Sequence, residues 1–96
     1  MDKIFYAIYN KEENKFLSIY EDGEGNEYYS LVDFEEINRD AIFKDEEYAK
    51  FKYKEATNIA GFSPRLNRIP YSIDFLRGAE IVPISISVRF DLIEEK

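Results

Sequence analysis

The sequence predicts an α+β domain: an antiparallel sheet of about four strands, with one main helix packed on one face and a possible short second helix. Three observations lead to this prediction. Apolar runs near the N-terminus are separated by polar turns, a central stretch has helical periodicity, and residues near the C-terminus alternate between apolar and polar. Because 96 residues can bury one core but not two, residues 1–96 are expected to form a single domain.

The first three strands are expected in the N-terminal third. Residues 4–9 (IFYAIY) are β-branched or aromatic on both alternating faces, which is typical of a central strand. A polar stretch at 10–15 leads to 16–20 (FLSIY), and a second turn at 21–27 leads to 28–32 (YYSLV). Strands that follow one another over such turns form a three-stranded antiparallel meander.

The main helix is expected from about Glu46 to Ala60. Residues 33–40 before it fit either a short helical turn or a loop, and the pattern does not decide between them. Asp45 is a good N-cap, and the acidic residues after it suit the positive end of the helix dipole. One stripe of the helix contains Ala49, Lys52, Tyr53, Ala56 and Ala60, with Tyr48, Phe51 and Ile59 on the adjacent stripe. Gly61 is expected to end the helix as its C′ residue.

The C-terminal strand has the clearest pattern in the chain. A connection over 61–70 and a short helical turn over 72–77, ending at Gly78, precede it. Val82, Ile84, Ile86, Val88, Phe90 and Leu92 alternate with Pro83, Ser85, Ser87, Arg89 and Asp91, so one face should be buried and the other wet. Pro83 cannot donate to a ladder, which places at least that end of the strand at a sheet edge or a bulge. We expect it to pair with residues 4–9.

Composition limits the classes of function. With no Cys and no His, a disulfide framework and a thiolate metal site are excluded, and the remaining catalytic groups need an enclosed pocket that this architecture seldom provides. We therefore expect no enzyme activity, no metal and no cofactor. There is no run of eighteen apolar residues and no signal-peptide pattern, which favours the cytoplasm of a bacterial host cell and no membrane.

The net charge of −7 is concentrated in one part of the chain. Residues 21–47 carry eleven acidic residues and two basic ones, whereas residues 61–96 are neutral. This block opposes direct binding of nucleic acid and favours a basic protein partner, for example a nucleic-acid-binding host effector. The predicted partner-binding residues are Asp22, Glu24, Glu27, Tyr28, Asp33, Glu35, Glu36, Asp45, Glu46 and Glu47. Tyr28 is included because tyrosine is enriched at protein interfaces. The alternative interpretation is a solvated face that only confers solubility.

The acidic, glycine-containing segment 22–27 resembles a calcium loop only superficially. It lacks the twelve-residue spacing and the closing Glu of an EF-hand, and no helix flanks it. We expect a tight turn in which Gly23 and Gly25 supply positive φ.

Three stretches, IFYAIYNKEENKFLS at 4–18, AIFKDEEYAKF at 41–51 and AEIVPISISV at 79–88, together resemble small acidic α+β accessory proteins of phages and other mobile elements of low-GC bacteria. The resemblance is architectural, covers most of the chain and carries over no site residue. Some such proteins inhibit host defence, including anti-CRISPR proteins that are acidic and mimic nucleic acid. The resemblance thus implies a protein-binding inhibitor or modulator of a host nucleic-acid-handling protein. The alternative is a self-associating structural or accessory phage protein, and either a monomer or a homodimer is compatible with the sequence.

Overall fold

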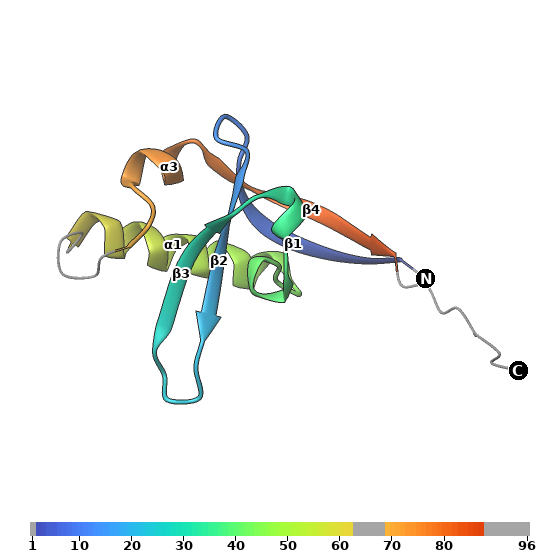
Figure 1. Cartoon of the computed structure of the whole chain (residues 1–96), viewed down its shortest axis with the longest axis horizontal. Coiled ribbons are helices and arrows are strands. Elements are labelled where there is room, and N and C mark those ends of the chain that lie inside the picture. The colour runs from blue at the N-terminus through green and yellow to red at the C-terminus, as the bar shows by residue number, and fades with distance from the viewer. Residues whose placement is uncertain (1, 63–68, 88–96) are drawn as a thin grey trace, which may run out of the picture.

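The computed structural model of the chain describes residues 2–62 and 69–87 (Figure 1). The strand positions predicted beyond Ser87, and most of the connection predicted over 61–70, lie outside these residues. The elements are β1 (Asp2–Asn10), β2 (Lys15–Glu21), β3 (Glu27–Val32), the 3-10 turns η1 (Phe34–Glu36) and η2 (Arg39–Ala41), α1 (Glu46–Phe62), α3 (Ile73–Arg77) and β4 (Ala79–Ser87). Four strands, one main helix and a short second helix confirm the predicted α+β class.

The four strands form one antiparallel sheet in the order β3-β2-β1-β4. β1 is central, as its two apolar faces predicted. β4 pairs with it over nine residue pairs, from Asp2↔Ser87 to Asn10↔Ala79, which confirms the predicted partner of the C-terminal strand. Pro83 lies in β4, which is an edge strand, so its missing N–H interrupts no central ladder.

β1 and β2 separate soon after the turn that joins them. Only two residue pairs connect them, Tyr9↔Phe16 and Asn10↔Lys15, so the sheet consists of two ribbons, β1–β4 and β2–β3, that diverge from one corner. A later segment enters this fork. The amide of Tyr6 donates to the carbonyl of Phe43 at 2.9 Å, and the amide of Phe43 donates back at 2.7 Å. Residues 33–40, for which the sequence fitted either a helical turn or a loop, therefore contribute to two 3-10 turns that lead into the fork.

α1 begins as predicted and ends later. The carboxylate of Asp45 accepts a hydrogen bond from the amide of Tyr48 at 2.7 Å, which is the expected N-cap contact. The prediction that Gly61 ends the helix was wrong, because the chain keeps helical geometry through Phe62 and Gly61 has no positive φ. Glycine lowers helix stability without forbidding a helix, so the last turn can include it.

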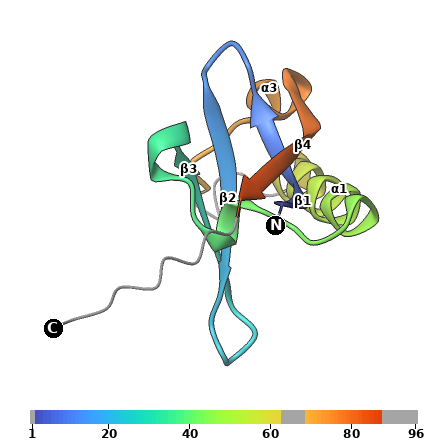
Figure 2. The ribbon, with the colours of Figure 1, turned by 90° about the vertical axis from the view of Figure 1, so that its right-hand side faces the viewer.

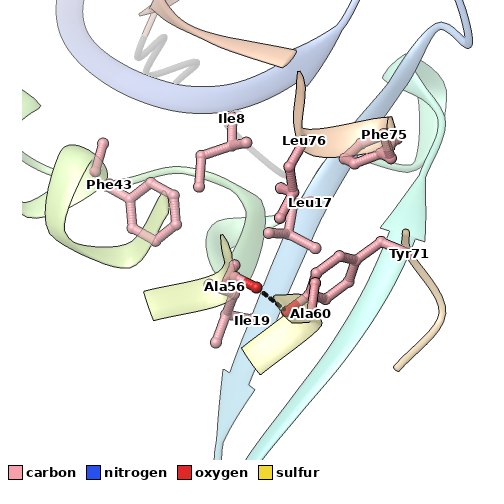
Figure 3. Close-up of a cluster of buried hydrophobic side chains, with 10 residues drawn as sticks. Ile8, Leu17, Ile19, Phe43, Ala56, Ala60, Tyr71, Phe75 and Leu76 are labelled. Carbon is pink, nitrogen blue, oxygen red and sulfur yellow. Dashed lines mark hydrogen bonds between the residues drawn. The ribbon is translucent and has the colours of Figure 1, made fainter. Parts of the chain in front are cut away.

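Two clusters of buried side chains lie on opposite faces of the sheet. On one face, α1 and α3 pack against the sheet, and the buried side chains there are Ile8, Leu17, Ile19, Phe43, Ala49, Ala56, Ala60, Tyr71, Phe75 and Leu76 (Figure 3). On the other face, the 3-10 turns cover a smaller cluster of Ala7, Phe16 and Ala41. Figure 2 shows α1 on one side of the strands and the green turns that follow β3 on the other.

The buried tyrosine hydroxyl of the larger cluster has a partner. Tyr71 donates to the carbonyl of Ala56 at 3.0 Å, drawn as a dashed line in Figure 3. Burial, assisted by the neighbouring Tyr29, raises the pKa of the Tyr71 hydroxyl above its ordinary value. A neutral, hydrogen-bonded Tyr71 therefore joins α1 to the segment that leads into α3.

Candidate partner-binding surface

The ten residues predicted to bind a partner do not form one patch. They fall into groups at the β2–β3 turn, at η1 and at the start of α1. The turn and η1 lie at opposite ends of β3, whose six residues span about 20 Å at about 3.3 Å per residue. Figure 1 likewise shows the tip of the β2–β3 hairpin pointing away from the turns that follow β3.

Asp22 organises the β2–β3 turn from within. Its carboxylate accepts hydrogen bonds from the amides of Glu24 (2.8 Å) and Asn26 (3.0 Å) and from the Asn26 side chain (3.1 Å). The backbone hydrogen bond from Asn26 and then that from Glu24 lower the pKa of Asp22. The segment is thus the tight turn that was predicted. Of its two glycines only Gly25 has positive φ, at 87°, so the expectation for Gly23 was wrong.

Tyr28 lies on the sheet face opposite α1. It pairs directly with Tyr20 across the β2–β3 ladder, with ring centroids 6.1 Å apart, and the two residues are 54% and 49% exposed. Its neighbour Tyr29 points the other way and packs against Tyr71. The hairpin therefore presents two tyrosine rings to solvent.

Glu27 forms an ion pair with a largely buried lysine. Its Oε2 lies 2.9 Å from Nζ of Lys52, whose side chain is only 9% exposed, and Glu55 lies 3.5 Å from the same ammonium. Burial by itself would lower the pKa of Lys52, but the hydrogen bond and charge of Glu27, with Glu55, outweigh it and raise the pKa. The ring of Tyr48, 5.6 Å from the ammonium, adds a cation–π contact.

A polar cleft of about 280 Å³ adjoins this ion pair, between the hairpin and the start of α1. It is lined by Ile19, Tyr20, Glu21, Glu27, Arg39, Asp40, Ile42, Phe43, Tyr48 and Lys52. Acidic and basic side chains both contribute to it, so the cleft carries no large excess of one sign.

The acidic residues at the start of α1 are engaged locally. Asp45 caps the helix, while Glu46 and Glu47 lie 3.4 and 3.5 Å from Nζ of Lys50. The charge of Glu46, and then that of Glu47, raises the pKa of Lys50. These carboxylates remain exposed, but a lysine partly balances them.

η1 presents two more exposed carboxylates, and Glu36 lies close enough to Lys15 that its charge adds to the effect of the Asp33 hydrogen bond in raising the pKa of that lysine. Asp33, just before η1, forms an ion pair with Lys15, and that hydrogen bond lowers the pKa of Asp33. Glu35 and Glu36 are exposed, and neither forms an ion pair with any residue in 2–62 or 69–87. Beside them Phe34 is 63% exposed. An exposed aromatic ring thus adjoins two carboxylates.

An apolar groove of about 450 Å³ lies between residues 34–42 and β4. Phe34, Ile37, Asn38, Arg39 and Ile42 line one side, and Ile84, Ser85 and Ile86 line the other. The alternation in β4 had predicted that Ile84 and Ile86 are buried, but they are only partly buried, because the groove opens beside them. The groove was not predicted from the sequence. The only signal was a pair of apolar residues, Phe34 and Ile37, in the undecided segment.

A scan against protein-family models and searches of curated proteins and solved structures gave no match to this chain. None of the described helices is long and apolar enough to cross a membrane. Within residues 2–62 and 69–87, no group of three or more acidic side chains is arranged to hold a metal ion. The function of the surface is therefore inferred from its geometry and charge.

Proposed function

We propose that the protein binds a basic surface of a host nucleic-acid-handling protein and inhibits or modulates it, as anti-CRISPR and related anti-defence proteins do. One observation carries the proposal: Glu35 and Glu36 are exposed and lack an ion pair with any described residue, within a stretch of net charge −9. Exposed carboxylates compete with phosphates for Lys and Arg in a nucleic-acid groove, and the charge also accelerates association with a basic partner.

Internal ion pairs and hydrogen bonds engage several of the predicted carboxylates, whereas Glu24, like Glu35 and Glu36, forms no ion pair with a described residue. Asp22, Asp33 and Asp45 hold local structure, Glu27 neutralises Lys52, and their carboxylates are less available to a partner. η1 combines two exposed carboxylates, neither in an ion pair with a described residue, with an exposed aromatic ring. Interfaces commonly pair an apolar centre with a polar rim, so this end of the sheet suits a partner better than the start of α1 does.

The proposal is tested by capture from a bacterial host lysate at about 0.05 M and about 0.5 M salt. The variant E35Q/E36Q removes the carboxylates of η1, and E46Q/E47Q is the matched control, since it removes the same charge from a site already balanced by Lys50. We expect nucleic-acid-binding proteins to be captured at low salt, and captured at least about fivefold less by E35Q/E36Q than by the control. The proposal fails if the captured proteins do not bind nucleic acids, or if salt leaves the capture unchanged.

A second candidate function is a self-associating structural or accessory phage protein. The exposed ring pair Tyr20 and Tyr28 favours it, because paired aromatic rings on an open sheet face are common at protein interfaces. Light scattering over a range of protein concentrations tests this directly. A mass that stays monomeric at all concentrations would exclude it.

A further inference from the structure

β4 forms one edge of the sheet, beside β1 (Figure 1). An edge strand presents a row of N–H and C=O groups to which a further strand can bond. Within residues 2–62 and 69–87, no backbone hydrogen bond joins β4 to a segment other than β1. The described part of the chain thus leaves the outer side of this strand open.

The backbone of Tyr6 shows which residues of β4 face the open edge. Its amide donates to the carbonyl of Phe43 and its carbonyl accepts from the amide of Phe43, so both groups point away from β4. Tyr6 is paired with Pro83. Opposite residues of an antiparallel pair alternate between exchanging two hydrogen bonds and exchanging none. Tyr6↔Pro83 is therefore a pair without hydrogen bonds, and the backbone nitrogen and carbonyl of Pro83 point to the open edge.

The same alternation assigns the neighbouring positions. Ile81 and Ser85 lie two residues to either side of Pro83, so their amides and carbonyls point outward as well, whereas those of Val82 and Ile84 point to β1. Because proline has no N–H, the row of outward donors has a gap in the middle of the strand. The donors that flank the gap are about 13 Å apart, at about 3.3 Å per residue, which is twice the spacing in an uninterrupted edge.

The composition of β4 shows what the gap prevents. Residues 81–87 (IVPISIS) contain four β-branched residues and no charged one. High β propensity and low charge favour pairing between identical strands, and proline opposes it. Charged residues, which protect many edge strands, are absent from this stretch of sequence. Pro83 is exposed, and its Cδ occupies the place of an amide hydrogen on the edge.

We propose that Pro83 protects the open edge of β4 and prevents it from pairing with β4 of a second copy of the chain. A second copy is the relevant partner, because two identical edge strands related by a two-fold axis can pair antiparallel along their whole length. In such a pair each Pro83 leaves a carbonyl of the facing strand without a donor. The inference does not depend on the proposed function. It restricts the self-associating alternative to other surfaces, such as the ring pair Tyr20 and Tyr28.

Amide hydrogen exchange of the full chain, followed by NMR, tests the orientation of the edge. The amides of Val82 and Ile84 should be protected because they bond to β1, and those of Ile81 and Ser85 should exchange fast at every protein concentration. Protection of Ile81 and Ser85 that rises with concentration would show that β4 pairs despite Pro83. Protection of the same two amides at every concentration would show that they do not face an open edge. Either result would overturn the proposal.

P83V restores the missing donor with a β-branched residue. P70V is the matched control, because Pro70 is exposed and lies outside the helices and strands. In light scattering from about 10 µM to about 1 mM, P83V should associate at least about tenfold more tightly than the wild type, and P70V should behave as the wild type does. The amides of Ile81 and Ser85 should become protected in the associated P83V.

The outcomes with P83V separate the edge from other contacts. A P83V chain that is folded by circular dichroism and associates no more than the wild type would overturn the role of Pro83. Association without protection of Ile81 and Ser85 would place the contact elsewhere and overturn it too. If P83V proves unfolded, P83T takes its place with the same expected results. All these failures would leave the proposed function standing, since no measurement here involves a host protein.

Discussion

Replacing Glu27 with Gln leaves the ammonium of Lys52 without its nearest carboxylate. In the folded protein the two groups lie 2.9 Å apart, and the Lys52 side chain is 9% exposed. Gln is close in size to Glu and can still accept a hydrogen bond from the ammonium, but it brings no charge. E27Q therefore isolates the electrostatic part of the contact between β3 and α1.

The expected loss is about 2 kcal/mol of unfolding free energy. Removing one partner of a fully buried pair costs about 3–5 kcal/mol. Here the loss of unfolding free energy is smaller, because the Glu27 side chain is 28% exposed and Glu55 remains 3.5 Å from the ammonium. For a domain of this length, a loss of about 2 kcal/mol lowers Tm by roughly 10 °C.

Chemical denaturation of E27Q and of E46Q, monitored by circular dichroism, measures this loss against a matched control. Glu46 also faces a lysine, but at 3.4 Å and with both side chains about half exposed, so E46Q should cost less than about 0.5 kcal/mol. Equal losses in the two variants would refute the reasoning. They would show that burial of Lys52 does not increase the stability that its ion pair with Glu27 provides.

Four other substitutions test the helix cap, a close approach with its control, and the acid response of the β2–β3 turn. D45A removes the side-chain acceptor at the start of α1 and should cost about 1 kcal/mol in denaturation. G78A places a Cβ 2.9 Å from Nδ2 of Asn10, whose buried hydrogen bond it should disrupt at about 1–2 kcal/mol, whereas G61A meets open space and should gain about 0.5 kcal/mol. Because the pKa of Asp22 is lowered in the folded state, its stabilisation is present above about pH 4 and is lost as pH falls through that lowered value. D22N should therefore flatten the fall of Tm between about pH 4 and pH 2, and an unchanged slope would exclude Asp22 as its source.

Local patterns determined most of the elements. Alternation and β-branched content placed the four strands, Asp45 placed the start of α1, and the short helix ending at Gly78 followed from its own residues. Such features depend on neighbours within a few positions, so they can be read from one sequence. The end of α1 was misplaced, since one glycine is a weak stop signal against continued helical contacts.

Of the candidate site, only its acidic charge was predicted from the sequence. The acidic block at 21–47 is evident in the sequence, and the role of its residues in binding a partner stays a prediction. The sequence could not show that Glu27 and Asp33 are taken up by Lys52 and Lys15, which lie 25 and 18 positions away. Nor could the sequence show that Glu35 and Glu36, unlike Glu27 and Asp33, form no ion pair with a described residue.

The sequence by itself determined the fold class, the central position of β1, the pairing of the C-terminal strand with β1 and the acidity of one stretch. Only the tertiary structure decided that β1 and β2 part after two residue pairs, that a bridge from Phe43 closes part of the fork, and that residues 34–42 form a groove with β4. The reason is physical. Periodicity reports which side chains avoid water, whereas a fork, an ion pair or a groove depends on which distant segments meet, and loop closure leaves no local pattern.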